Sequence, residues 1–170
     1  MFTDSHCHLT FPELASSIDS IRQAMAEARV DRAMCICTTL EEFEQVHALA
    51  LRFDNFWASA GVHPDNEGVL EPSLDDLLTR GSLPKVLAIG ETGLDYYRLG
   101  TRTLADMNWQ RERFRVHIRA ARALHKPLVI HTRSASVDTL AILREEGETG
   151  GVGSAGGVFH CFTESMEVAR

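Results

Sequence analysis

Six residues of this chain combine side chains that bind metal ions with positions that could bring them together. His6 and His8 stand one residue apart in DSHCHL, and four more follow singly in GVHP, IGETGLDYY, IHTR and FHCFT: His63, Glu91, His131 and His160. Imidazole and carboxylate groups are ligands for Zn²⁺, Mn²⁺ and related cations. In an extended strand, residues i and i+2 face the same way, so His6 and His8 can share a metal while Cys7 points to the other side.

The elements that must position these residues alternate between short apolar runs and longer helical segments. Six runs are predicted to be strands, over 2–6, 32–38, 56–61, 85–90, 127–131 and 156–160. Helices are predicted over 13–29, 41–53, 73–80, 106–125 and 136–146, with a sixth starting near Thr163. Ser73 is expected to cap the helix at 73–80. Strands that alternate with helices indicate βαβ units and a parallel sheet.

The candidate metal ligands gather at one kind of position, the carboxyl end of a predicted strand. His6 and His8 end the first strand, and the third to sixth strands lead to His63, Glu91, His131 and His160 in that order. Parallel α/β folds bind their ligands at this end of the sheet. A single HxH pair in a chain with eight histidines arises easily by chance, but candidates at five equivalent strand ends do not. The pattern therefore favours a metal site, and a buried Glu91 would need a cation or proton beside it.

Two folds are compatible with six strands in 170 residues. One is a doubly wound open sheet. The other is a partial (β/α)8 TIM barrel with about six of its eight βα units present, since a whole barrel needs roughly 250 residues. We expect residues 1–170 to form a single domain, incomplete at its C-terminus.

The composition indicates which binding partners and which cellular compartment to expect for this chain. The formal net charge of −7 disfavours non-specific wrapping of nucleic acid by the whole surface. Cys35 and Cys37 lie in an apolar run and are expected to be small core residues without disulfides, which favours the cytoplasm. The N-terminus does not resemble a signal peptide, and no apolar run approaches the roughly 18 residues of a membrane span, so no membrane partner is expected.

Other features favour structural interpretations. The histidines expected inside helices are interpreted as ordinary structural residues: His47, His117 and His125. Four arginines on one helix are interpreted as a solvated charged face: Arg111, Arg115, Arg119 and Arg122. The Gly-rich segment 147–157 precedes a strand and is expected to be a loop. The chain has no Walker loop, no strand-led GxGxxG and no GxSxG motif.

The motifs DSHCHL, GVHP, IGETGLDYY, IHTR and FHCFT, in this order, resemble the TatD-type metal-dependent deoxyribonucleases of the amidohydrolase-like TIM barrels. The resemblance runs from Phe2 to about Glu164. It implies hydrolysis of DNA phosphodiester bonds with two divalent metal ions, which could be Zn, Mn or Mg. It further implies that His6 and His8 bind one metal, and that Glu91 is catalytic and bridges both.

By the same resemblance, His131 and His160 would bind the second metal, and His63 would contact the substrate phosphate. Arg133 is expected to do the same, because its planar guanidinium suits phosphate, although a surface charge is an equal alternative.

The chain departs from the family pattern after the sixth strand. Family members carry a further metal-binding Asp in a TDxP-like motif on the last barrel strand, and Asp138 lies in a predicted helix and cannot replace it. We therefore expect an open barrel edge that leads to aggregation, loose folding or self-association. Two alternatives stay open: an inactive metal-binding remnant, and an amidohydrolase-like enzyme acting on another small ester or amide.

Overall fold

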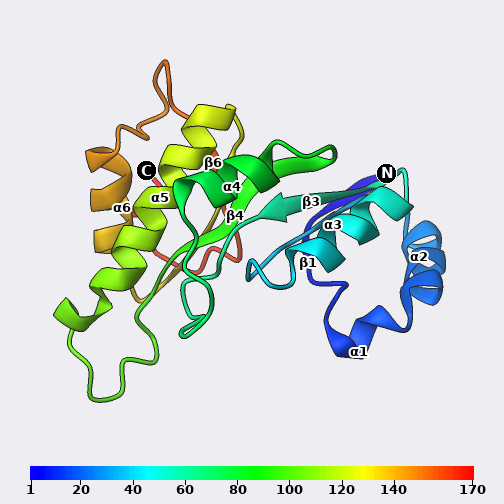
Figure 1. Cartoon of the computed structure of the whole chain (residues 1–170), viewed down its shortest axis with the longest axis horizontal. Helices are drawn as coiled ribbons and strands as arrows, with labels where there is room; N and C mark the ends of the chain where they lie inside the picture. Colours follow the sequence, from blue (N-terminus) through cyan, green and yellow to red (C-terminus); the bar gives the residue numbers. More distant parts are fainter.

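A computed structural model describes residues 1–170 and contains a single curled sheet of six parallel strands (Figure 1). The strands are β1 Phe2–Cys7, β2 Val30–Cys35, β3 Phe56–Ala60, β4 Val86–Asp95, β5 Leu128–Arg133 and β6 Gly157–Phe159. Each strand pairs with the next along the chain, in the order β1-β2-β3-β4-β5-β6. A doubly wound sheet reverses its strand order, whereas a barrel does not. The curled half-barrel therefore confirms the predicted partial TIM barrel.

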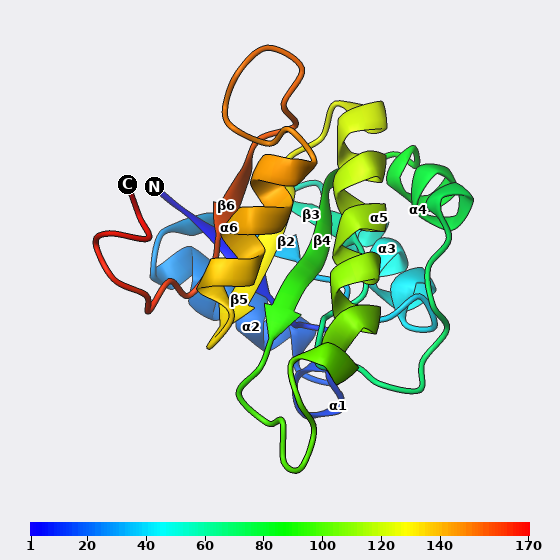
Figure 2. The same ribbon diagram turned by 90° about the vertical axis from the view of Figure 1, so that its left-hand side faces the viewer.

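Helices connect the strands and pack against one face of the sheet (Figure 2). They are α1 Pro12–Ala15, α2 Ile18–Glu27, α3 Phe43–Arg52, α4 Leu74–Gly81, α5 Asn108–Leu124 and α6 Ser136–Glu145, with a 3-10 turn at Ala105–Met107 before α5. Ser73 caps α4 as predicted, because its hydroxyl accepts from the Asp76 amide in a capping box. None of the helices is both long and apolar enough to cross a membrane.

Two helix predictions differ from the structure. The segment 13–29 is divided into α1 and α2, and the break falls at Ser16 and Ser17, where serine favours a helix end over a helix interior. The helix predicted near Thr163 is absent, since only turns follow β6. Short helices draw most of their stability from burying an apolar face. Met166 is 70% exposed, so this segment has no such packing.

The two faces of the sheet are buried to different extents. Alternate residues of β2 point in opposite directions, so Ala33 and Cys35 belong to a core of 28 residues under the helices. Met34 packs instead with a much smaller cluster of Ile36, Ala88 and Val129. Apolar side chains on the strands remain accessible, including Leu87 at 48% and Val158 at 49%. The strand order leaves β1 and β6 each paired on one side only, so the predicted open edge is present, and self-association through it stays a prediction.

Ion pairs neutralise the arginine row of α5. Three of these arginines contact glutamates that lie at or beyond the end of α6, with N–O distances of 2.6–3.2 Å: Arg115–Glu145, Arg119–Glu146 and Arg122–Glu148. Arg111 lies 3.5 Å from Asp138 of α6. The charges join α5 to α6, and the structural interpretation of this row is confirmed.

Helix α5 also holds the loop that follows β3. The buried Nε2 of His117 accepts a hydrogen bond of 2.9 Å from the Val62 amide, and its Nδ1 lies 2.8 Å from the Arg113 carbonyl. Arg113 in turn donates to the carbonyls of His63 and Asn66 at 2.9 and 2.8 Å. A neutral imidazole with its proton on Nδ1 satisfies both partners of His117, so α5 fixes the backbone beside His63.

This packing predicts an acid-sensitive stability. Burial lowers the pKa of His117 from 6.5 to about 4. Below pH 6.5 the unfolded chain binds a proton that the folded chain excludes, so the free energy of unfolding falls as the pH drops. Between pH 7 and pH 5 the wild type should lose about 2 kcal/mol more than His117→Gln, measured by urea denaturation. The carboxylates titrate in both proteins and cancel in the comparison. Equal losses would contradict a buried, neutral His117.

Candidate metal centre

The six predicted residues converge at the carboxyl end of the sheet. They come from the ends of β1, β3, β5 and β6 and from the middle of β4, and the centre of the group is the carboxylate of Glu91. A cavity of about 390 Å³ opens onto five of the six, namely His8, His63, Glu91, His131 and His160. Residues up to 154 positions apart in the sequence are thus brought within reach of one carboxylate.

Strand β4 places Glu91 by running farther than its apolar sequence predicts. The strand was expected to end at residue 90, but it continues to Asp95 beside β5. Gly93 pairs with His131 at φ +125°, and a Cβ there would collide with the His131 carbonyl oxygen. Gly90 has φ +143° and is crowded by the Val129 carbonyl oxygen. Only glycine adopts these angles readily, so the two glycines let β4 carry Glu91 alongside β5.

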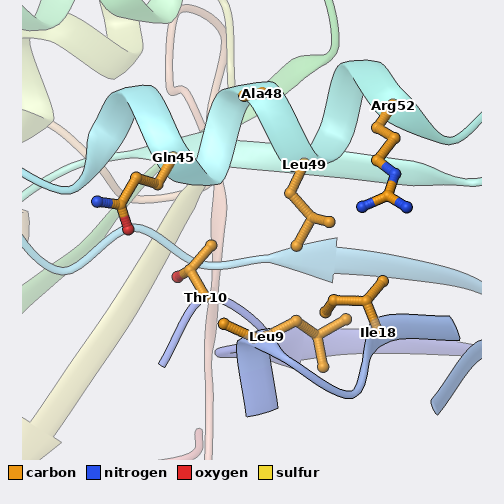
Figure 3. Close-up of a pocket in the computed structure, with 8 residues that line it drawn as sticks. Leu9, Thr10, Ile18, Gln45, Ala48, Leu49 and Arg52 are labelled. Carbon is orange, nitrogen blue, oxygen red and sulfur yellow. The ribbon is translucent and has the colours of Figure 1, made fainter. Parts of the chain in front are cut away.

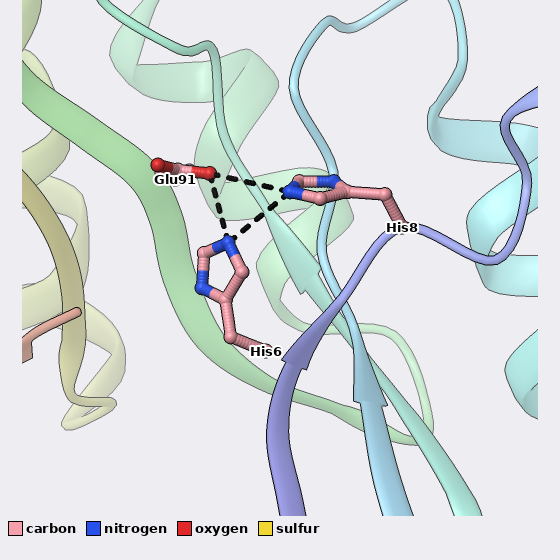
Figure 4. Close-up of side chains that lie close together, drawn as sticks. All are labelled: His6, His8 and Glu91. Atoms are coloured by element: carbon pink, nitrogen blue, oxygen red, sulfur yellow. Dashed lines mark hydrogen bonds and ion pairs between the residues drawn. The ribbon is translucent and has the colours of Figure 1, made fainter. Parts of the chain in front are cut away.

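The first donor group contains His6, His8 and Glu91 (Figure 4). The Nε2 atoms of His6 and His8 are 3.2 Å apart. Oε2 of Glu91 lies 3.1 Å from the first of them and 3.8 Å from the second. Ligands about 2.1 Å from a tetrahedral metal are separated by about 3.4 Å. The spacing of these three atoms therefore fits one shared cation.

The second donor group surrounds the other oxygen of Glu91. Oε1 lies 3.3 Å from Nδ1 of His131, 3.5 Å from Nε2 of His63 and 2.5 Å from Nε2 of His160. Glu91, His63 and His131 have the spacing of a metal-binding group. The two oxygens of one carboxylate thus face separate sets of imidazoles, which is the geometry that a bridging ligand needs.

Glu91 is a buried charge that the imidazoles make tolerable. Its side chain is only 3% exposed. Burial acts to raise the pKa of Glu91, but the close imidazoles of His131, His160, His6 and His63 outweigh it and hold this pKa far below its usual range. The carboxylate is therefore ionised at neutral pH and available as a ligand. Burial and the neighbouring His6 lower the pKa of His8, which keeps that imidazole neutral and able to coordinate.

Asp95 is a buried residue of the centre that the sequence prediction missed. Its Oδ2 lies 3.0 Å from Nε2 of His131, on the side of the ring opposite Glu91. Burial acts to lower the pKa of His131, but the hydrogen bonds to Asp95 and Glu91 raise it to about 9. A carboxylate behind a histidine fixes the ring orientation in many metal sites. Asp95 stands four positions after Glu91 in IGETGLDYY. Because the sequence predicts that the strand ends at residue 90, it does not place Asp95 beside His131.

The donor set itself supports a divalent cation. Nε2 of His160 is buried and has no hydrogen bond of suitable geometry, although it faces Oε1 of Glu91. A buried ring nitrogen without a partner is costly, and a cation between it and the carboxylate would satisfy both. Five imidazoles and one carboxylate favour Zn, Mn, Fe or Co by ligand type.

Arg133 lies outside the donor cluster. Its guanidinium stacks on the ring of Tyr97, with 3.6 Å between the guanidinium carbon and the ring centroid. It follows His131 by two residues on β5, so both residues face the same side of the sheet. The cavity is also lined by residues that the sequence did not single out: Phe11, Thr38, Asp65 and Asn66.

A second hollow of about 280 Å³ lies between α3 and the segment from β1 to α2 (Figure 3). Its lining is mainly apolar, with Leu9, Ile18 and Leu49, and Arg52 at one end. It contains no histidine, cysteine or carboxylate. This hollow therefore offers no metal-binding side chain.

Comparisons with known proteins agree with this geometry. A family model described as TatD related DNase matches residues 3–170. The uncharacterized metal-dependent hydrolase YcfH of Escherichia coli K12 is 40% identical, over 98% of this chain and 60% of its own length. The 3'-5' ssDNA/RNA exonuclease TatD of Salmonella typhimurium LT2 is 28% identical, over 96% of this chain and 60% of its own length.

The crystal structure of YjjV, a TatD homologue from Escherichia coli K12, superimposes with a TM-score of 0.86 at 27% identity. It matches 99% of this chain, which covers 62% of that structure. The chain thus spans about three fifths of the length of these relatives.

Metal binding should depend on the first strand. His6→Ala combined with His8→Ala removes two of the three donors of the first group and should lower the bound metal by at least one ion per chain, measured by elemental analysis after dialysis against Mn or Zn. His125→Asn is the matched control. The His125 side chain is exposed, and its backbone at the end of α5 has the left-handed conformation, which asparagine tolerates. Unchanged metal content in the double variant would exclude β1 as a source of ligands.

Asp95 should control the proton on His131. In the metal-free protein, His131 is expected to titrate near pH 9, and Asp95→Asn should lower this pKa because the variant removes a negative charge at 3.0 Å. NMR titration of the imidazole resonances measures the change. Asp54→Asn, an exposed position, is the control. If His131 has the same pKa in Asp95→Asn and in the wild type, the assigned contact is wrong.

Proposed function

Because this chain belongs to the TatD-related DNase family, we propose that it is a metal-dependent hydrolase that cleaves the phosphodiester bonds of DNA. The observation that carries the proposal is the convergence of five imidazoles on the two oxygens of Glu91, at the end of the sheet where barrel enzymes hold their substrates. In this proposal residues 1–170 act as one barrel domain. The four free cysteines favour a reducing, cytoplasmic location.

The proposed site holds two divalent ions. His6 and His8 would hold one, His131 and His160 would hold the other, and Glu91 would contribute to both. His63 lies as close to Oε1 of Glu91 as His131 does, within 0.2 Å. His63 also lines the cavity, which supports its proposed role as a phosphate contact.

The metals and the protein supply different parts of the chemistry. Bound divalent ions lower the pKa of a water molecule and neutralise negative charge that develops on phosphoryl oxygens. The chain's own residues position these partners: Glu91 stays ionised, Asp95 orients His131, and Arg113 holds the carbonyl of His63. The Asn66 side chain donates to the Thr38 carbonyl at 2.9 Å, which keeps the loops after β2 and β3 together at the cavity wall.

Substitution of the bridging residue tests the proposed activity. Glu91→Gln keeps the shape of the side chain but removes its charge, so hydrolysis of single-stranded DNA with Mn or Mg should fall by at least about a hundredfold. Glu112→Gln is the control, because Glu112 is an exposed glutamate of α5 that pairs only with Arg115.

Circular dichroism and thermal unfolding would establish that both variants fold. Activity in Glu91→Gln equal to that of the wild type would refute the assigned role. Metal binding without any nuclease activity in the wild type would instead favour the inactive metal-binding alternative.

A further inference from the structure

Beyond the metal cluster, the ends of β4 and β5 carry an exposed aromatic ring paired with a cation. Tyr97 is 59% exposed, and the Arg133 guanidinium lies against one face of its ring at 3.6 Å. The guanidinium forms no ion pair, in contrast to the arginine row of α5. We call these two residues the Tyr97–Arg133 pair.

The pair is held in a fixed relation to the metal centre. Oδ1 of Asp95 accepts from the Tyr97 amide at 2.9 Å, while Oδ2 of the same carboxylate contacts His131 at 3.0 Å. The Tyr96 amide donates to the Arg133 carbonyl at 2.9 Å and joins the two strand ends. One buried carboxylate therefore connects the exposed ring to a candidate metal ligand.

The neighbouring Tyr96 has a different environment from Tyr97, so the two tyrosines have different roles. Tyr96 is buried at 6% exposure, and its hydroxyl donates to Asp138 of α6 at 2.8 Å. Tyr96 thus anchors this turn to the helix layer. No structural contact of that kind uses the Tyr97 side chain, whose only ring contact is with Arg133.

The strand geometry gives the direction and the spacing from the metal centre. Arg133 is two residues beyond His131 on β5, so it lies roughly 6.6 Å farther along the strand on the same side. Tyr97 follows the end of β4 and stacks against Arg133. The carboxyl ends of β4 and β5 lie at the same end of the sheet (Figure 2). A strand of nucleic acid with one phosphate at the metal centre would pass over the pair.

We infer that the Tyr97–Arg133 pair is a stacking platform for an unpaired nucleobase of a single-stranded substrate. Bases stack on exposed aromatic rings regardless of their sequence, and an arginine beside the ring adds positive charge for the adjoining phosphate. A base inside a duplex has both faces covered by its neighbours and cannot use the ring. The inference rests on the proposed nuclease function and names the residues on which an unpaired base would stack.

Binding without turnover tests the platform separately from catalysis. The probes are a fluorescein-labelled dT₁₀ and an abasic oligomer with the same number of phosphates, each titrated by fluorescence anisotropy with the 170-residue chain in low salt and EDTA. Tyr97→Leu should weaken the binding of dT₁₀ between about five- and a hundredfold and leave the abasic oligomer unchanged. Tyr97→Trp should retain dT₁₀ binding, because it preserves an aromatic face.

Phe2→Leu is the matched control, since Phe2 is an aromatic residue of similar exposure, 60%, at the opposite end of the sheet. It should bind both oligomers as the wild type does. The platform would be overturned if Tyr97→Leu bound dT₁₀ as tightly as the wild type does. It would also be overturned if the variant lost affinity equally for both oligomers, or if the wild type did not bind dT₁₀.

Nuclease assays separate this inference from the proposed function. If the wild type cleaves dT₁₀ with Mn and Tyr97→Leu cleaves it with the same KM and kcat, the platform is overturned and the nuclease proposal stands. Raised KM with little change in kcat supports the platform. A wild type that binds dT₁₀ through Tyr97 but does not cleave it would reject the nuclease proposal and retain the platform.

Discussion

The burial of the Glu91 carboxylate is the constraint on which the rest of the structure depends. A charged side chain with 3% exposure is strongly unfavourable unless groups of opposite or complementary character surround it. The sheet meets this requirement from four other strand ends, each of which brings an imidazole to within 3.8 Å of one of the two carboxylate oxygens. The same arrangement that makes the buried charge tolerable also creates two adjacent sets of metal donors.

Two features of the fold fix the backbone around the metal donors: the glycines of β4 and the contacts made by α5. Two glycines allow β4 to continue past the carboxylate alongside β5. Gln110 of α5 is buried and pairs with both backbone groups of Asp95, at 2.9 and 3.1 Å, so the helix layer fixes the end of β4. Arg113 and His117 of the same helix hold the loop that carries His63. A single helix thus positions the end of β4 and the loop after β3, and the packing of α5 supports the geometry of the donor cluster.

The charge at the metal site differs from the charge of the surface as a whole. The chain has a net charge of −7, and the arginines of α5 are neutralised by the acids of α6 and the loop after it. A polyanionic substrate therefore gains little attraction from the surface at large. At the carboxyl end of the sheet, Arg133 is free of ion pairs, and bound cations would add further positive charge there.

The sequence by itself determined the strand order of the donors, the alternation of strands and helices, and the six residues that meet at the site. These features follow from local patterns: apolar runs, i and i+2 spacing, and polar residues placed after each run. It could not determine that β4 extends to Asp95, that Asp95 lies behind His131, or that Arg133 stacks on Tyr97. Those facts depend on pairing between β4 and β5, whose sequences are more than 30 residues apart, and on α5 packing over both. The tertiary structure alone decided them because hydrogen bonds and burial across strands, not local propensity, set where a strand ends and which side chains meet there.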